Sequence, residues 1–249
     1  MRPLTHTGQA RNLRRQSIYL LPNSFTLAAL FGGFYAIVQA MNRNFDHAAV
    51  AIFVSMVLDG MDGRVARMTH TQSAFGAEFD SLSDMVSFGV APALVVYEWM
   101  LRDFGRLGWI VAFIYCAAAA LRLARFNTNL DVVDKRFFQG MPSPTAAAMV
   151  AGLVWVSLEM GWKGDWLSWS SLAMTAFAGL SMVSNVKFYS FKEINVRKTV
   201  PFVLLLPILF ALLAIAYHPP VALFALFVSY GVSGYVYTVW QMLKPQKKA

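Results

Sequence analysis

The sequence predicts an all-α, polytopic transmembrane helix bundle, and three observations lead to this fold class. Of the 249 residues, 57% are hydrophobic and 14% are charged, and the mean hydropathy is +0.51. Apolar runs long enough to cross a bilayer recur along the chain, separated by short polar or turn-forming segments. Lysine and arginine gather in alternate segments between those runs. No linker or internal repeat divides the chain, so we expect one membrane domain over residues 1–249.

Eight spans, with both termini on the same side, are predicted by following each apolar run to the charged or turn-forming residues that end it. Asn23 or Ser24 can cap the first span. A polar turn at residues 161–165 separates the fifth span from the sixth, and Pro219 with Pro220 separates the last two. The spans are expected near residues 22–41, 46–62, 80–101, 108–126, 144–161, 166–184, 199–217 and 219–243.

The basic residues predict an orientation. Seventeen of the 21 lysines and arginines fall on one side of the predicted spans. Because positively charged segments stay cytoplasmic, both termini and the segment between the second and third spans are expected on that side. The net charge of +8 fits anionic headgroups better than nucleic acid, because the cations flank apolar spans. The four opposite cations are Arg43, Arg102, Arg106 and Lys163.

Four aspartates stand close together inside this apolar chain. On a helix, residues three or four apart share a face, so Asp59 projects with Asp62, and Asp80 with Asp84 on the next helix. A charged carboxylate near the bilayer centre costs at least about 2.5 to 3.5 kcal/mol, so the four need compensation. Carboxylates suit Mg²⁺ or Mn²⁺, and two such ions about 3.5 to 4 Å apart can clamp a phosphate. The alternative is a proton or ion relay in a transporter.

The aspartates belong to a longer pattern, D-x₂-D-G-x₂-A-R-x₈-G-x₃-D-x₃-D. It resembles the signature of the CDP-alcohol phosphotransferase family at all of its defined positions. The resemblance implies a membrane enzyme that attacks a CDP-linked lipid with an alcohol and releases CMP, and it implies a homodimer. It further implies that Asp59, Asp62 and Asp80 bind two divalent ions, and that Asp84 is the base and can also contact metal. The matching positions are Asp59, Asp62, Gly63, Ala66, Arg67, Gly76, Asp80 and Asp84.

The remaining motif residues suit a CDP-linked lipid. Gly63 and Gly76 lack side chains where the cytidine and the pyrophosphate would approach the backbone. Ala66 leaves room for the base, as the resemblance implies, and Arg67 offers a planar fork to phosphate oxygens. The alternative for both glycines is a helix-end cap. The stretch LPNSFT resembles the polar entrance of the family and adds two candidates for phosphate or metal-shell contacts, Asn23 and Thr26.

Two later segments indicate the acceptor alcohol. Residues 121–145 and 182–192 resemble stretches typical of CDP-diacylglycerol serine O-phosphatidyltransferases, a branch of the same family. Serine carries a carboxylate, which Arg122 or Arg125 can bind through two parallel hydrogen bonds. The alternative is that these arginines only mark the cytoplasmic end of a helix. The further candidates for the serine site are Asn127, Ser143 and Lys187.

The predicted reaction is therefore transfer of the phosphatidyl group from CDP-diacylglycerol to L-serine at the cytoplasmic face of the inner membrane. Residues 22–195 are expected to form the catalytic core, residues 199–243 to add two spans, and residues 1–20 to form an interfacial amphipathic helix. Two other functions stay open. The nearest is the same chemistry with glycerol 3-phosphate as the acceptor, and the other is a membrane cation transporter.

Overall fold

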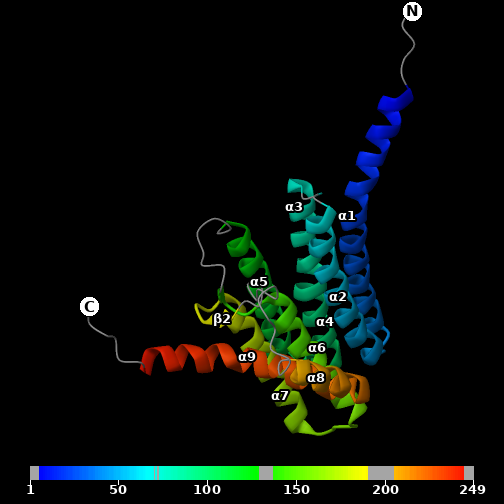
Figure 1. Ribbon diagram of the computed structural model, residues 1–249. Coiled ribbons are helices and arrows are strands. Elements are labelled where there is room, and N and C mark those ends of the chain that lie inside the picture. The colour runs from blue at the N-terminus through cyan, green and yellow to red at the C-terminus, as the bar shows by residue number, and fades with distance from the viewer. Residues whose placement is uncertain (1–5, 70, 72, 129–136, 190–204, 244–249) are drawn as a thin grey trace, which may run out of the picture.

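The chain folds into a bundle of helices, seen in the computed structural model in Figure 1. The structure describes residues 6–69, 71, 73–128, 137–189 and 205–243. The predicted all-α class is confirmed, because helices dominate these residues. Four helical segments of the described chain are long and apolar enough to cross a membrane, as expected of an integral membrane protein. Eight spans and cytoplasmic termini stay predictions. The four segments are Pro22–Met41, Ala74–Trp99, Arg106–Thr128 and Pro219–Leu243.

Within the described residues, helices lie in each of the predicted spans, although residues 199–204 of the seventh span lie outside them. Two helices extend further into the motif than predicted. The second helix was expected to end at residue 62 and continues to Thr69, and the third begins at Ala74 rather than at residue 80. Ser73 caps that third helix, because its side chain accepts a hydrogen bond from the Gly76 N–H. The elements are α1 (His6–Met41), α2 (Phe45–Thr69), α3 (Ala74–Asp84), the π-helical turn η1 (Met85–Val90), α4 (Ala91–Trp99), the 3₁₀ turn η2 (Leu101–Phe104), α5 (Arg106–Thr128), α6 (Ser143–Glu159), α7 (Asp165–Val183), α8 (Leu205–Tyr217) and α9 (Pro219–Leu243).

The start of the first helix differs from the sequence expectation. Asn23 and Ser24 were expected to cap a span, whereas α1 begins at His6 and passes through Pro22 to Met41. The capping prediction is therefore wrong. Both residues are instead helical, and Asn23 lies beside the first turn of α3. The interfacial helix proposed for residues 1–20 stays a prediction.

Small residues bring α1 and α2 into close contact. Ala36, Ala40, Ala48 and Ala49 are fully or almost fully buried in one apolar cluster. A Cβ atom at Gly32 would lie 2.3 Å from the Ser55 Oγ, so a larger residue there would require the Ser55 hydroxyl to move. Close backbone contact through small residues is the usual way in which membrane helices associate. The α1–α2 pair thus forms a rigid support for the aspartates of α2.

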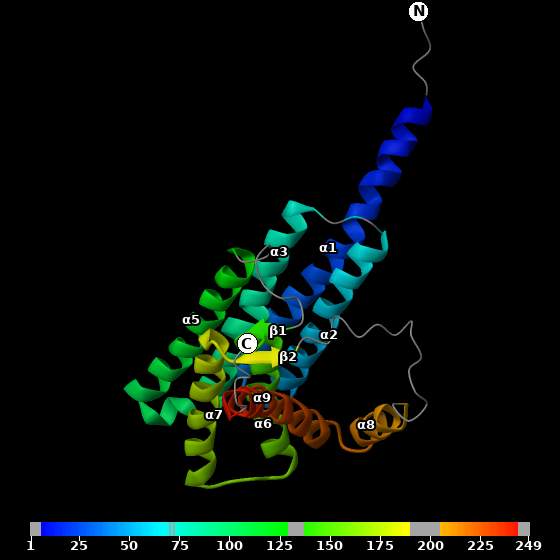
Figure 2. The same ribbon diagram turned by 60° about the vertical axis from the view of Figure 1, so that its left-hand side comes forward.

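A two-stranded sheet joins the two segments that follow α5 and α7. Strand β1 (Phe137–Gln139) pairs antiparallel with β2 (Lys187–Tyr189). Between β1 and α6, Gly140 has a φ of 80°, and a Cβ there would lie 2.2 Å from the Met182 carbonyl oxygen. Helix α9 runs across the bundle beside this sheet (Figure 1). Helix α8 lies at the edge of the bundle (Figure 2). The sheet and α9 therefore border the end of α5 that carries the predicted serine site.

Candidate active site

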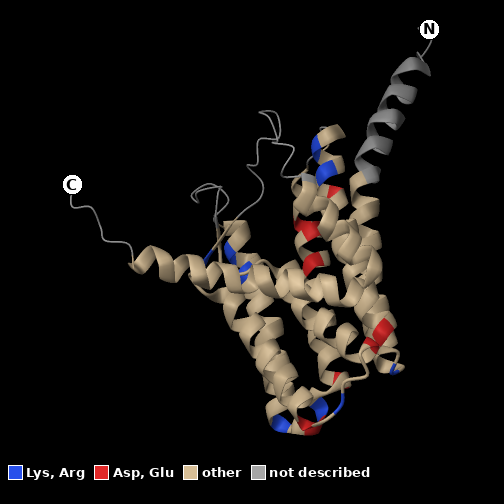
Figure 3. Cartoon of the chain, turned by 60° about the horizontal axis from the view of Figure 1, so that its bottom comes forward, with Lys and Arg blue, Asp and Glu red and all other residues tan. Residues whose placement is uncertain are grey.

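The structure brings the four aspartates of the motif together. Asp59 and Asp62 lie on α2, while Asp80 and Asp84 lie on the last two turns of α3. Asp59, Asp62 and Asp80 each offer a carboxylate oxygen, and these atoms all lie within 4.8 Å of one another. Asp84 is not part of this group of three but interacts with Asp59. Figure 3 shows acidic segments partway along this pair of helices and basic segments beyond them.

The aspartate cluster has the chemistry of a divalent metal site. Within the described residues, Asp80 Oδ1 and Asp84 Oδ1 are buried and have no hydrogen-bond partner. Several carboxylates so close together repel one another unless a cation balances their charge. An all-oxygen donor set suits Mg²⁺ or Mn²⁺ rather than zinc. The residues present therefore fit a hard divalent cation.

Helix α1 contributes two polar groups to the same site. The Thr26 hydroxyl donates a hydrogen bond to Asp62 Oδ2 at 2.7 Å. Asn23 lies beside the first turn of α3, because its Oδ1 is 3.4 Å from where a Cβ on Gly76 would stand. Both were predicted as contacts of the phosphate or of the metal shell. In the structure, Thr26 orients an aspartate of the cluster, while Asn23 lines the approach to it.

The other motif residues surround this approach. Gly63 lies inside α2, so the alternative that it caps a helix end is wrong. Gly76 lies in the first turn of α3, and its N–H is already satisfied by the Ser73 Oγ at 3.0 Å. Arg67 is exposed, and its Nη1 is 3.6 Å from where a Cβ on Gly63 would stand. Ala66, one position before it, is half-buried. The Arg67 side chain thus extends back along α2 toward the aspartates.

Two arginines of α5 form a cationic site, and one of them lies near Asp84. The Arg122 Nη1 donates a hydrogen bond to the buried Ser143 Oγ at 2.8 Å, and the Arg125 Nη2 donates to the Val183 carbonyl oxygen at 3.3 Å. Arg122 and Asp84 are close enough to interact electrostatically. In the part of the chain that the structure describes, Arg122 Nε and Arg125 Nη1 are buried without a hydrogen-bond partner. These unused donors face a desolvated region, where an anion would satisfy them.

Two predicted acceptor residues occupy other positions. The Asn127 Nδ2 donates to the Ser81 Oγ at 3.0 Å, so this side chain joins α5 to α3 next to Asp80. Lys187 is exposed on β2 and pairs in register with Gln139. Arg122, by contrast, donates its hydrogen bond to Ser143 at the start of α6. Residues 129–136 and 190–192 of the two acceptor segments lie outside the described residues.

Sequence reasoning missed Ser81 and Tyr230. Ser81 follows Asp80 on α3 and holds Asn127. Tyr230, on α9, is close enough to Arg122 to interact electrostatically, and its hydroxyl donates to the Tyr189 carbonyl oxygen at 3.0 Å. The only available signal for Ser81 was its place between two motif aspartates. No sequence pattern links Tyr230 on α9 to Arg122 on α5, because the two residues are far apart in the chain.

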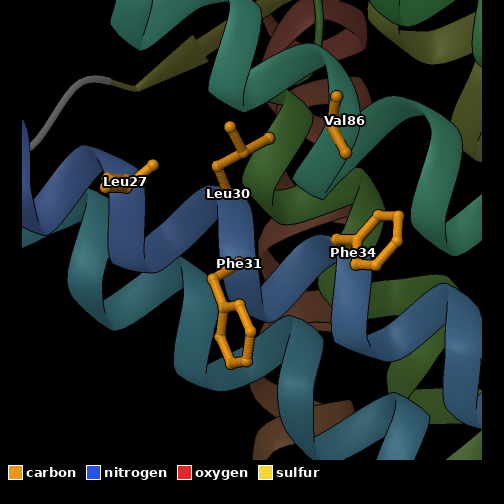
Figure 4. A pocket seen from close by; sticks show the side chains of 5 residues that line it. All are labelled: Leu27, Leu30, Phe31, Phe34 and Val86. Atoms are coloured by element: carbon orange, nitrogen blue, oxygen red, sulfur yellow. The ribbon is translucent and has the colours of Figure 1, made fainter.

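An apolar groove opens between α1 and η1 (Figure 4). It has a volume of about 350 Å³ and lies between α1 and η1. The groove starts one residue after Thr26 on α1, and its one contribution from η1 comes two residues after Asp84. The residues that line the groove are thus close in the sequence to residues of the charged site. The lining residues are Leu27, Leu30, Phe31, Phe34 and Val86.

Comparison with known proteins agrees with this geometry. The profile of the CDP-alcohol phosphatidyltransferase family matches residues 19–179. A CDP-diacylglycerol–serine O-phosphatidyltransferase of Helicobacter pylori is 39% identical over 178 residues, which cover 72% of this chain and 75% of that protein. Proteins of the same name from Methanocaldococcus jannaschii (40% over 137 residues, 55% and 61% covered) and Saccharomyces cerevisiae (33% over 164 residues, 60% and 56% covered) are also similar. The chain therefore belongs to the CDP-alcohol phosphatidyltransferase family.

Proposed function

We propose that this protein transfers the phosphatidyl group of CDP-diacylglycerol to L-serine, giving phosphatidylserine and CMP. The observation that carries the proposal is that Asp59, Asp62, Asp80 and Asp84 meet near Arg122, in a bundle that also has an apolar groove between α1 and η1. Such a site can take a diphosphate, a lipid tail and an anionic acceptor at once. The names of the relatives in three distant organisms agree with serine as that acceptor.

Asp84 is the proposed general base. It interacts with Asp59 but does not belong to the group of Asp59, Asp62 and Asp80 that would bind the metal. Its Oδ1 has no hydrogen-bond partner among the described residues, so this oxygen is available to accept a proton. An alcohol is a weak nucleophile while protonated, and a carboxylate at about 2.6 to 3.2 Å can accept that proton during attack. The serine oxygen then forms a bond to the lipid-side phosphorus. The bond from that phosphorus to the oxygen of CMP breaks, and CMP leaves with the electron pair.

Asp59, Asp62 and Asp80 are the proposed metal ligands, and Asp84 can add a fourth carboxylate. Two Mg²⁺ or Mn²⁺ ions bound there would neutralise the charge that develops on the pyrophosphate oxygens. The chain itself supplies the orientation of these ligands. Thr26 fixes one oxygen of Asp62, and the packed α1–α2 pair fixes the helix that carries Asp59.

The cytidine diphosphate is proposed to lie along α2 and the start of α3. Arg67 would bind phosphate oxygens, and Gly63, Ala66 and Gly76 would let the nucleotide approach the helix backbones. Asn23 would complete this surface from α1. One acyl chain would then extend from the phosphate into the groove between α1 and η1.

Arg122 and Arg125 are the proposed partners of the serine carboxylate. Each has a buried N–H group that lacks an acceptor among the described residues, as expected of a site that binds an anion, and Ser143 accepts a hydrogen bond from Arg122. Because Arg122 also lies near Asp84, a carboxylate bound there places the serine hydroxyl beside the base. Asn127 would border this pocket through Ser81, and Lys187 would act only from its rim. We propose that this site faces the cytoplasm, because most lysines and arginines lie on the same side of the predicted spans.

The test is release of CMP by purified protein in mixed micelles that contain CDP-diacylglycerol and Mn²⁺ or Mg²⁺. L-serine, glycerol 3-phosphate and no acceptor are compared, and the lipid product is identified. Release that depends on serine, with phosphatidylserine formed, supports the proposal. Release only with glycerol 3-phosphate keeps the aspartate chemistry and overturns the acceptor assignment. Cation flux in proteoliposomes without any CMP release would support the transporter instead.

Direct attack by serine is a separate part of the proposal. The aspartates have a full set of roles without a covalent phosphatidyl-enzyme. Labelled CMP should therefore not exchange into CDP-diacylglycerol when serine is absent. Exchange at a rate near that of turnover would contradict direct attack and indicate a covalent intermediate.

A further inference from the structure

The helix that carries Asp80 and Asp84 changes its winding immediately after Asp84. The π-helical turn η1 follows, and the Ala91 N–H bonds to the Val86 carbonyl oxygen, five residues back. Single π turns are rare and occur often at functional sites. One inserted residue rotates the two flanking helical segments by about 100° relative to each other. The turn therefore sets the direction in which the aspartates of α3 face relative to the buried α4.

Pro92 explains why the helix widens here. It stands at the start of α4, four residues after Phe88. Proline has no N–H, and its ring crowds the carbonyl group four residues before it. The Phe88 carbonyl thus loses the donor that an α-helix would provide. Within a membrane, water does not replace that donor, so another group of the protein has to do so.

Tyr115 of α5 replaces the missing donor. Its hydroxyl donates a hydrogen bond to the Phe88 carbonyl oxygen at 3.0 Å. Its side chain is completely buried. Helix α7 covers it closely, because a Cβ at Gly179 would lie 3.0 Å from the Tyr115 Cα. The position of Tyr115 is therefore fixed by its packing, so its hydroxyl group can fix the position of η1.

The opposite side of the π turn is tied to α1. The Ser87 Oγ donates to the Ala29 carbonyl oxygen at 3.0 Å, and the Ser83 Oγ donates to the Thr26 carbonyl oxygen at 3.1 Å. The segment around Asp84 thus has hydrogen bonds to α1 on one side and to α5 on the other. Among these, the bond from Tyr115 is the one that satisfies the backbone group released by Pro92.

We propose that Tyr115 is a positioning residue for the transfer reaction: its hydroxyl holds η1 so that Asp80 and Asp84 face Asp59 and Asp62. The proposal rests on the proposed function, since it assumes that these aspartates carry out the chemistry. Tyr115 itself lies in the core and acts through the backbone of Phe88. Loss of its hydroxyl should slow the chemical step and leave substrate affinity nearly unchanged.

The test compares Tyr115→Phe with Tyr235→Phe in the full-length protein in detergent. The Tyr235 hydroxyl also joins two helices, because it lies 2.6 Å from the Ser181 Oγ, but it does not contact the π turn. Three quantities are measured in each variant: the thermal midpoint, kcat and KM for serine at saturating Mn²⁺, and amide hydrogen exchange over residues 85–93. Exchange reports on the π turn whether or not the protein turns over.

Tyr115→Phe should lower kcat by about tenfold to a hundredfold, as misplaced catalytic groups do. Its KM for serine should stay within about twofold of the wild-type value, and exchange over residues 85–93 should become faster. Tyr235→Phe should lower the thermal midpoint comparably while kcat stays within about twofold. Wild-type kcat and wild-type exchange in Tyr115→Phe would overturn the proposal, and so would losses of kcat that follow the thermal midpoint equally in both variants.

A second variant separates the hydrogen bond from general packing. Pro92→Ala supplies an N–H to the Phe88 carbonyl, so adding Tyr115→Phe to this background should no longer speed exchange over residues 85–93. The same acceleration in both backgrounds would overturn the role of this hydrogen bond. If the wild-type protein releases no CMP with serine, the proposed function fails, whereas the exchange comparison still decides whether Tyr115 holds η1.

Discussion

Thr26 and Asp62 are joined by a hydrogen bond of 2.7 Å that crosses from α1 to α2, with the threonine hydroxyl as donor. Both side chains are buried. The bond leaves the other oxygen of Asp62 free to serve in the aspartate cluster and prevents the carboxylate from rotating. A residue that hydrogen-bonds to a metal ligand commonly changes metal affinity by about 10-fold to 100-fold when it is lost. The first prediction follows from this relationship.

Thr26→Ala should weaken Mn²⁺ binding by about tenfold or more, because Asp62 loses its orienting donor. Thr26→Ser keeps the hydroxyl and should bind Mn²⁺ within about threefold of the wild-type protein. Binding can be measured by electron paramagnetic resonance in the absence of lipid substrate. Equal affinity in both variants would show that the hydrogen bond does not orient a ligand.

Asp84→Asn should abolish turnover and leave binding of CDP-diacylglycerol largely intact. The amide cannot accept the serine proton, and loss of a general base typically lowers kcat by about 10²- to 10⁴-fold. Asp46→Asn is the matched control, because that carboxylate is exposed at the start of α2. CMP release and equilibrium binding of the lipid are measured for both. Full activity in Asp84→Asn would remove Asp84 from the role of base.

Arg122→Lys should raise KM for serine by about tenfold or more, because the ammonium group cannot form two parallel hydrogen bonds to a carboxylate. Ser143→Ala removes the hydrogen-bond partner of Arg122 and should raise the same KM by a smaller factor. The double variant tests whether the two residues act together, since coupled residues give effects that do not add. Strictly additive effects would show that Ser143 does not hold Arg122 in place. A change confined to KM for CDP-diacylglycerol would place Arg122 outside the serine site.

Gly33→Ala should destabilise the protein and reduce activity together. A Cβ at Gly33 would lie 2.7 Å from the Ser87 Cα, so α1 and η1 would have to separate. Overpacking of this kind costs about 1 to 3 kcal/mol. Gly60→Ala is the control, because nothing lies within 4 Å of its Cβ position, and alanine should stabilise a helix there by about 0.5 to 1 kcal/mol. Thermal midpoints in detergent measure both, and an unchanged midpoint in Gly33→Ala would contradict the close contact.

The sequence was sufficient to predict the helices and the meeting of the aspartates. Spacings of three and four residues place Asp59 with Asp62 and Asp80 with Asp84 on one helix face each, and that rule is local. The helix ends were harder to predict. Polar and charged residues such as Arg64 and Arg67 look like a loop beside an apolar span, yet α2 carries them to Thr69. Hydropathy reports where a chain can enter a bilayer and not where its helix stops.

Contacts between distant helices could not be predicted in this way. Thr26 donates a hydrogen bond to Asp62, which is 36 residues away in the sequence, and Tyr115 donates one to the Phe88 carbonyl, which is 27 residues away. Each depends on how two helices pack, which is decided by the shapes of many side chains together. The proline that releases the Phe88 carbonyl was visible in the sequence. The sequence did not show which of the predicted helices would supply the replacement donor.

The groove between α1 and η1 has a consequence for how the rate must be measured. It is lined only by apolar residues, and Leu27, Phe31 and Phe34 among them are exposed on the surface of α1. A lipid that enters this way never leaves the bilayer, whereas serine and CMP exchange with water. Turnover should therefore follow the mole fraction of CDP-diacylglycerol in the micelle or membrane, not its bulk concentration. Diluting it with inert detergent should slow the enzyme even when the total amount of substrate is constant.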